Sequence, residues 1–204
     1  MLDTRVRRLT GPSLDRVAAA IDRPGVTPDR LTLLNLALGL TSAGCAAAQL
    51  WPAALAAWLL CRVADGLDGP LARRRPPRDA GAGGFLDITA DFVVYGSTVV
   101  GVAVGATAGE GAAWLPFVLV LLAYYVNGTA LLAFSSIAER AGRRRDDGRS
   151  LSFLGGLAEG TETVVVHALW LLLPGSAETI AWAWAAVVAV SSGQRVVSGY
   201  RALR

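Results

Sequence analysis

Residues 31–60, LTLLNLALGLTSAGCAAAQLWPAALAAWLL, contain no Asp, Glu, Lys or Arg. A membrane-spanning helix needs about 20 predominantly apolar residues, so this stretch is too long for one span and long enough for two. The pair Trp51-Pro52 interrupts it, and proline is tolerated in the first turn of a helix but not in its interior. We therefore predict one spanning helix before Trp51 and another after it.

The rest of the chain has four more long charge-free stretches, at 92–109, 111–138, 163–177 and 179–194. Hydrophobic residues make up 53% of the 204 residues, and the mean hydropathy is +0.47. Both values are too high for an ordinary soluble domain. We therefore predict an all-α integral membrane protein. Its six transmembrane helices are expected at 31–50, 53–73, 85–106, 113–138, 153–173 and 178–200.

The basic residues, all of them arginine, predict the orientation of these helices. All except Arg62 gather in 1–30, 73–78, 140–149 and 195–204, and the connections on the opposite side have none. Arginine-rich segments remain in the cytoplasm. Both termini are therefore expected on the cytoplasmic side.

The first 30 residues are expected to form a cytoplasmic segment, because they lack the apolar core of a signal peptide. Leu14–Ile21 has apolar residues at helical spacing and charges on its other face. This is typical of a short interfacial helix on the inner leaflet, and a soluble cap is the alternative. Residues 31–204 would then form the six-helix transmembrane domain.

Two pairs of aspartates lie near the cytoplasmic ends of the second and third predicted spans. Asp65 and Asp68 are three residues apart, and Asp87 and Asp91 are four apart, so each pair shares one helix face. The short connection 74–84 makes the two helices antiparallel neighbours, which predicts four carboxylates at one depth. Because such a cluster repels itself, we expect it to bind Mg²⁺ or Mn²⁺, which favour carboxylate oxygens and phosphate-containing substrates.

The residues between the aspartates suit a phosphate-containing ligand. Gly66 and Gly69 let a ligand approach the backbone closely, and Ala72 keeps the next turn thin. Arg73 offers a planar fork to a diphosphate. The alternative is that the aspartates form structural ion pairs with Arg62, Arg73 and Arg74. Four aspartates with two glycines and an arginine at this spacing favour a binding site over ion pairs.

This passage resembles the signature of the CDP-alcohol phosphatidyltransferase family, D-x-x-D-G-x-x-A-R followed after a short gap by G-x-x-x-D-x-x-x-D. Residues 65–73 and 83–91 fill every fixed position. Residues 85–92, 152–163 and 195–200 are similar to a bacterial branch of the family with no assigned acceptor. The resemblance implies an enzyme of the bacterial plasma (inner) membrane, with its active site on the cytoplasmic side and 31–204 as the catalytic domain.

The resemblance also implies a reaction and the residues that perform it. Family members transfer a group from a CDP-linked lipid, usually CDP-diacylglycerol, to a small alcohol and release CMP in phospholipid biosynthesis. Two Mg²⁺ or Mn²⁺ ions are expected, and Asp91 is expected to act as general base as well as ligand. The expected metal ligands are Asp65, Asp68, Asp87 and Asp91. The expected contacts of the nucleotide are Gly69, Ala72 and Arg73.

The acceptor is predicted from charged residues near the inner ends of the later spans. Arg195 and Arg145 would bind a phosphorylated acceptor such as glycerol 3-phosphate or inositol phosphate. Glu159 and Glu162 would repel that phosphate and suit an amino alcohol instead. All four could equally be structural charges or serve membrane orientation.

Partners and competing functions complete the expectations. The resemblance implies a homodimer, and Gly101 and Gly105 form a small-residue face that would suit it; the same face could serve packing within one chain. No nucleic-acid partner is expected. A prenyltransferase would use two distant aspartate motifs, whereas a divalent-cation carrier or membrane scaffold would leave Gly69, Ala72 and Arg73 unexplained.

Overall fold

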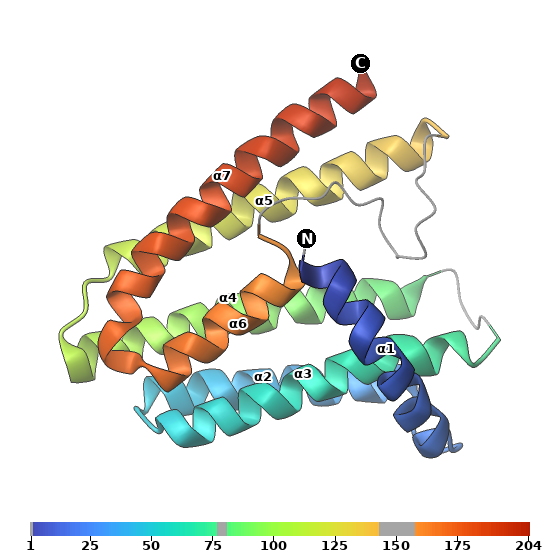
Figure 1. Ribbon diagram of the computed structural model, residues 1–204, viewed down its shortest axis with the longest axis horizontal. Helices are drawn as coiled ribbons and strands as arrows, with labels where there is room; N and C mark the ends of the chain where they lie inside the picture. Colours follow the sequence, from blue (N-terminus) through green and yellow to red (C-terminus); the bar gives the residue numbers. More distant parts are fainter. Residues whose placement is uncertain (1, 77–80, 143–157) are drawn as a thin grey trace.

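The structure, a computed structural model, describes residues 2–76, 81–142 and 158–204, and these residues are helical apart from short connections (Figure 1). The helices are α1 (Leu2–Ile21), α2 (Pro28–Ala47), α3 (Trp51–Arg73), α4 (Ala82–Glu110), α5 (Leu115–Arg140), α6 (Gly160–Leu172), the 3₁₀ helix η1 (Pro174–Ser176) and α7 (Ala177–Leu203). The predicted all-α class is confirmed.

Three helical segments of the described chain are long and apolar enough to cross a membrane: α4, α5 and the continuous segment Pro174–Leu203. α2 has 20 residues and α3 has 23, but the inner part of α3 carries the charged motif. Many large apolar side chains point outward, among them Leu59, Leu122 and Val190. Such an exterior is typical of a protein surrounded by lipid.

The fifth predicted span differs from the structure at its start. α6 begins at Gly160 and has only 13 residues, whereas the prediction placed the span at 153–173. Glu159 has an extended backbone, with φ of −116° and ψ of −176°, and glycine at the next position favours a helix end over a helix interior. Residues 153–157 lie outside the described part of the chain. The other five helices match their predicted spans, with ends shifted by at most four residues.

α2 organises one half of the molecule, because it packs along both α3 and α4. α3 and α4 pack little on one another in the described chain, so these neighbours face one another across a space instead of packing closely. α6 packs against both of them as well. The space between α3 and α4 is therefore bordered by α2 and α6. Charged and aromatic side chains occupy this space, and their size and charge prevent close packing of the two helices.

Glycines allow the close approach of α2 and α4. A Cβ atom on Gly101 would meet the backbone carbonyl oxygen of Ala43, and one on Gly105 would meet that of Ala46. The small-residue face of α4 is thus used within the chain, which is the alternative to the predicted dimer contact. The homodimer itself stays a prediction.

α5 and α7 form the other half and extend side by side beyond the other helices (Figure 1). The Ser192 hydroxyl donates a hydrogen bond to the Ala123 carbonyl (3.3 Å), and the Trp184 indole N–H donates one to the Tyr124 hydroxyl (2.6 Å). α7 is joined to α6 through η1, and the Trp170 indole closes this corner by donating to the Ala177 carbonyl (3.1 Å).

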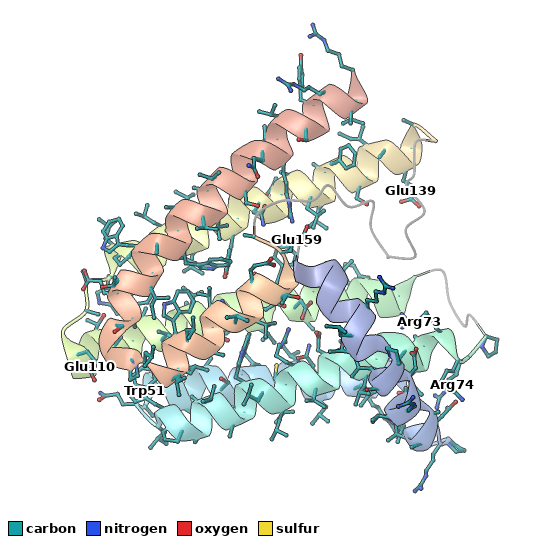
Figure 2. All side chains as sticks on the ribbon, in the orientation of Figure 1. Trp51, Arg73, Arg74, Glu110, Glu139 and Glu159 are labelled. Atoms are coloured by element: carbon teal, nitrogen blue, oxygen red, sulfur yellow. The ribbon has the colours of Figure 1, made fainter. Side chains whose placement is uncertain are left out.

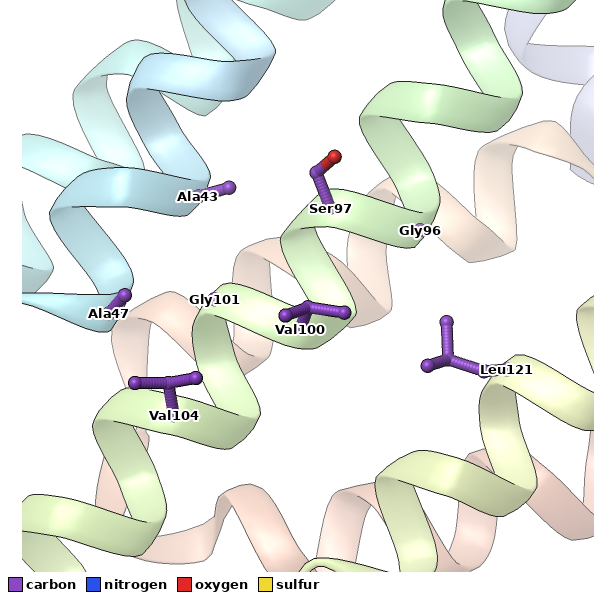
Figure 3. Close-up of a pocket in the computed structure, with 8 residues that line it drawn as sticks. All are labelled: Ala43, Ala47, Gly96, Ser97, Val100, Gly101, Val104 and Leu121. Carbon is purple, nitrogen blue, oxygen red and sulfur yellow. The ribbon is translucent and has the colours of Figure 1, made fainter.

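An apolar groove of about 530 Å³ opens beside α4, more than one turn beyond the aspartates (Figure 3). It is bordered by α2, α4 and α5 and has no charged residue in its lining. The lining residues are Ala43, Ala47, Gly96, Ser97, Val100, Gly101, Val104 and Leu121. This groove suits apolar groups such as acyl chains, and the motif aspartates are not part of its lining.

α1 packs its apolar side on the protein. Ala18 is buried with Leu31, Leu67 and Leu71, and Leu14 packs against this cluster. Leu14 also lies 3.5 Å from the position that a Cβ atom would take on Gly66. The amphipathic segment predicted near the membrane surface therefore covers the inner end of α3.

Replacing Gly101 with alanine is expected to destabilise the protein. The added methyl group would collide with the backbone of Ala43, which can move only if α2 shifts, and overpacking of this kind costs about 1–3 kcal/mol. Thermal unfolding in detergent measures the effect as a lower Tm. Gly96→Ala on the same helix is the control, because a Cβ atom there has nothing within 4 Å. Equal Tm values for the two variants would contradict the assigned α2–α4 contact.

Candidate active site

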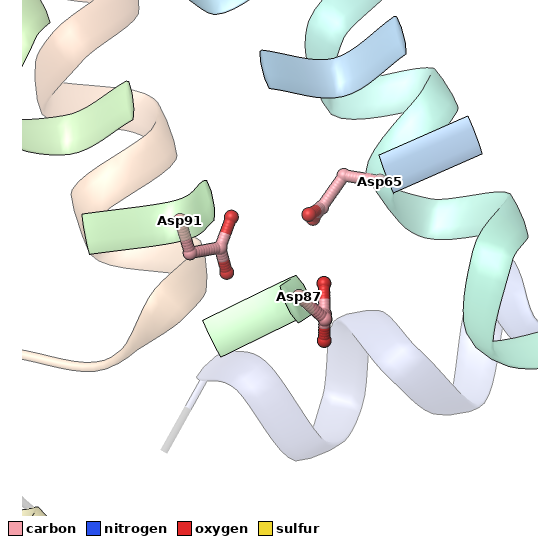
Figure 4. A group of neighbouring side chains, drawn as sticks. All are labelled: Asp65, Asp87 and Asp91. Atoms are coloured by element: carbon pink, nitrogen blue, oxygen red, sulfur yellow. The ribbon is translucent and has the colours of Figure 1, made fainter. Parts of the chain in front are cut away.

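The motif aspartates lie toward the end of α3 and the start of α4, at the mouth of the space between these helices. Asp65 projects from α3, and Asp87 and Asp91 project from α4 toward the same point (Figure 4). One carboxylate oxygen from each of the three lies within 4.8 Å of the others. The predicted convergence of the two helix faces is therefore present for these three residues.

This arrangement fits a divalent cation. Magnesium and manganese prefer carboxylate oxygens, and a separation below 5 Å allows several oxygens to reach one ion. All three aspartates are partly exposed, so they are accessible to a ligand. Two ions in this site remain a prediction.

Asp68 lies at the edge of the group, next to Asp87. It is 8% exposed, and its carboxylate accepts hydrogen bonds from the Thr32 hydroxyl (2.9 Å) and the Gly69 amide (2.6 Å). These bonds turn it toward α2, and it is not one of the three converging carboxylates. The role of Asp68 as a metal ligand stays a prediction, and Thr32 is a partner that the sequence did not indicate.

Arg62 forms the inner wall of the site. Its Nη1 atom lies 3.5 Å from both Asp65 Oδ2 and Asp91 Oδ1, and its side chain is only 8% exposed. From the sequence, Arg62 was expected only as a possible ion-pair partner. Its position is the signal that could have found it, because it is the one arginine outside the four arginine-rich segments and lies one helical turn before Asp65.

The predicted nucleotide contacts lie at the mouth. Arg73 is 67% exposed, and its Nη2 lies 4.0 Å from Asp15 of α1; Figure 2 shows it beside that helix. A Cβ atom on Gly69 would lie 3.4 Å from Arg73 Nη1, so this glycine keeps space next to the guanidinium. Ala72 is exposed. No nucleotide contact of these three residues is tested by the structure.

The segment after α3 is fastened to the α1–α2 connection. Arg75 Nη2 donates to Asp22 (2.7 Å) and to the carbonyl of Val26 (2.7 Å), and Arg74 Nε lies 3.4 Å from Asp22. The hydrogen bond from Arg75 lowers the pKa of the Asp22 carboxyl. The stabilisation is therefore complete above the unfolded-state pKa and is lost only as the pH falls through the lower folded-state value.

The predicted acceptor residues gather where α6 begins. The Ala158 amide donates to the Ser191 hydroxyl (3.2 Å), which brings the start of α6 to α7 one turn before Arg195. Arg195 is 4% exposed and is attracted by the charge of Glu159. The Oε2 atom of Glu162 is buried and has no hydrogen-bond partner among the residues that the structure describes. Arg145 lies outside those residues.

Aromatic residues fill the space behind the aspartates. His167 is buried between the rings of Trp58, Tyr95 and Trp170, and its Nε2 lies 3.0 Å from the hydroxyl of Tyr124. His167 therefore links α6 to α5 through Tyr124 and closes the site on the side away from its mouth.

The chain belongs to the CDP-alcohol phosphatidyltransferase family, whose sequence model matches residues 25–191. It is 38% identical over 210 residues to the inner membrane protein YnjF of Escherichia coli, covering 100% of this chain and 98% of that protein. It is also 28% identical over 201 residues to the phosphatidylinositol phosphate synthase of Mycobacteroides abscessus, covering 93% of this chain and 82% of the synthase.

Two solved structures share the fold. They are of the Mycobacterium tuberculosis phosphatidylinositol phosphate synthase PgsA1, one with CDP-DAG bound and one in complex with manganese and citrate. Their TM-scores are 0.71 and 0.70 at 20% and 21% identity. The first match covers 92% of this chain and 93% of that chain, and the second covers 92% and 88%. The family resemblance read from the aspartate motif is confirmed.

Manganese is expected to raise the Tm of the purified protein, because it would bind the folded carboxylate group and not the unfolded chain. At a concentration one hundred times the Kd, the gain is about 2.7 kcal/mol. Excess EDTA should remove it, and Asp87→Asn should abolish most of it. Glu110→Gln, at the opposite end of α4, is the control and should respond as the wild type does. A full manganese response in Asp87→Asn would exclude the three-carboxylate site.

Proposed function

We propose that this chain transfers a phosphatidyl group from a CDP-linked lipid, CDP-diacylglycerol in the first instance, to the hydroxyl group of a small alcohol, with release of CMP. The observation that carries the proposal is the convergence of Asp65, Asp87 and Asp91 within the family motif. The PgsA1 structure with CDP-DAG bound supports the choice of donor.

Two divalent cations, Mg²⁺ or Mn²⁺, would be held by the four motif aspartates, Asp65, Asp68, Asp87 and Asp91. Such ions, when bound, neutralise the diphosphate and stabilise the charge that develops on the departing phosphate. Manganese in one PgsA1 structure supports this choice. The carboxylates lie at the cytoplasmic mouth, where a water-soluble nucleotide can reach them.

The chain's own residues would position the reactants. Arg73 presents its fork to the diphosphate, with Gly69 and Ala72 leaving space for the nucleotide beside α3. Asp91 accepts the proton of the acceptor hydroxyl, whose oxygen then bonds to the lipid-bearing phosphorus while the bond from that phosphorus to the CMP oxygen breaks. Most of the rate enhancement in phosphoryl transfer comes from such positioning and charge stabilisation.

The acceptor we favour is a phosphorylated polyol, with glycerol 3-phosphate ahead of inositol phosphate. Arg195 is buried at the inner part of α7 beside Glu159, and its guanidinium would bind a phosphorylated acceptor through charge-assisted hydrogen bonds. The phosphatidylinositol phosphate synthase among the relatives supports a phosphorylated acceptor. Arg145 is the second proposed contact. Glu159 and Glu162 favour an amino alcohol instead, and this is the competing acceptor.

The proposed setting is the inner membrane of a bacterium, with six spans, both termini and the active site on the cytoplasmic side, and a homodimeric assembly. The likeness to an inner membrane protein of Escherichia coli and the long apolar helices of the described chain support the membrane location. The arginine distribution supports the orientation.

Purified protein is expected to release CMP from CDP-diacylglycerol when given manganese and an alcohol from a panel that includes glycerol 3-phosphate, inositol phosphate, inositol and serine. Asp91→Asn should lower kcat about a hundredfold or more, because it loses the general base. It should still bind donor, measured as a Tm increase with CDP-diacylglycerol. Glu139→Gln, at the exposed end of α5, is the matched control. Manganese binding without CMP release from any alcohol would favour a cation carrier instead.

Arg195→Ala is expected to raise the KM for a phosphorylated acceptor roughly 10–100-fold, because a charge-assisted contact of arginine with phosphate contributes about 1.5–3 kcal/mol. The KM for CDP-diacylglycerol should stay unchanged. Arg201→Ala, six residues further along α7, controls for the loss of one positive charge. If only the donor KM changes, or neither does, an uncharged or amino alcohol becomes the favoured acceptor.

A further inference from the structure

Both Nη atoms of Arg62 are held by groups of the protein. On the cytoplasmic side, its Nη1 atom lies 3.5 Å from Asp65 and 3.5 Å from Asp91. On the opposite side, Nη1 donates to the Tyr95 hydroxyl (2.9 Å), and Nη2 donates to Asn35 Oδ1 (2.8 Å). The guanidinium carbon also lies 4.8 Å from the centre of the Trp58 ring.

These contacts fix both the place and the charge of the guanidinium. Its planar group is sandwiched near two aromatic rings, Trp58 and Tyr95, which favour a cation over their faces. Asn35 is fully buried and also accepts a hydrogen bond from Cys61 (2.8 Å), so it is itself held in one orientation. Residues of α2, α3 and α4 therefore hold the arginine rigidly in contact with the two carboxylates.

A structural role for this arginine would require only that it neutralise one buried carboxylate. Arg62 instead lies equally far from Asp65 and Asp91, which belong to different helices and to the three-carboxylate group. α3 and α4 pack little on each other. The guanidinium is thus a direct bridge between these helices at the level of the site.

We propose that Arg62 is a positioning residue that acts as a fixed cation of the site, holding Asp65 and Asp91 in register across the gap and weakening the binding of the exchangeable divalent cation. This rests on the proposed metal site. The charge of the arginine repels a divalent ion bound by the same carboxylates, and in partly buried surroundings such repulsion is strong. The fork geometry, in contrast, acts on the orientation of Asp91, and therefore on turnover.

The charge and the geometry make separate, measurable contributions. In Arg62→Gln both are lost, so the affinity for Mn²⁺ should rise about tenfold or more while kcat falls about tenfold or more, with the KM for CDP-diacylglycerol within about twofold of wild type. In Arg62→Lys the charge remains and the fork is lost. Its Mn²⁺ affinity should stay near the wild-type value while kcat still falls.

Titration calorimetry with Mn²⁺ alone, on metal-free protein in detergent, measures the affinity independently of turnover. Arg140→Gln is the control, because it removes one positive charge from the exposed end of α5 and should leave Mn²⁺ binding unchanged. Tyr95→Phe removes one bond that holds Nη1 and keeps the charge. It should lower kcat without changing the affinity. If Arg62→Gln does not fold, Arg62→Met takes its place, because it also removes the charge and keeps an apolar side chain beside Trp58.

The outcomes separate this inference from the proposed function. Wild-type protein that binds Mn²⁺, with Arg62→Gln binding equally or more weakly, overturns the role of Arg62 and leaves the metal site intact. A changed Mn²⁺ affinity in Tyr95→Phe or a much weaker one in Arg62→Lys also overturns it. Wild-type protein that binds no Mn²⁺ overturns the metal site and the role of Arg62 together.

Discussion

Negative charge gathered at the inner ends of two apolar helices is the constraint on which the rest of the structure depends. Asp65, Asp87 and Asp91 approach within 4.8 Å of one another, and carboxylates this close repel one another strongly in surroundings poor in water. Each nearby feature relieves part of this repulsion. Arg62 supplies a positive charge, the Thr32 hydroxyl donates a hydrogen bond to the fourth aspartate, and α2 packs along both α3 and α4, which pack little on one another.

The convergence of these aspartates is the part of the site that could be predicted from the sequence. Aspartates three and four residues apart share a helix face by the geometry of the helix alone. Their convergence needed only antiparallel helices joined by a short connection. The family followed from eight fixed positions within 27 residues, and the sequence model that matches residues 25–191 agrees with it.

What the sequence could not supply was the lateral arrangement of the helices. The spacing of residues along α3 and α4 does not show that α2 packs along both helices. The contact of Thr32 with Asp68 therefore could not be predicted. The direction of Arg62 depends on Asn35 and Tyr95, which come from two other helices. Gly101 and Gly105 of α4 were compatible with a dimer contact or with packing inside the chain, and only the three-dimensional structure shows that they pack against α2.

The brevity of α6 bears on how the proposed reaction would bring together two substrates of opposite solubility. Thirteen helical residues rise about 20 Å, well short of a hydrocarbon layer about 30 Å thick. Backbone that is not helical is tolerated at such depth only beside protein or water. We expect water to enter beside Glu159. A polar acceptor could then remain hydrated until it reaches the carboxylates, while the acyl chains of the donor stay dissolved in the surrounding lipid.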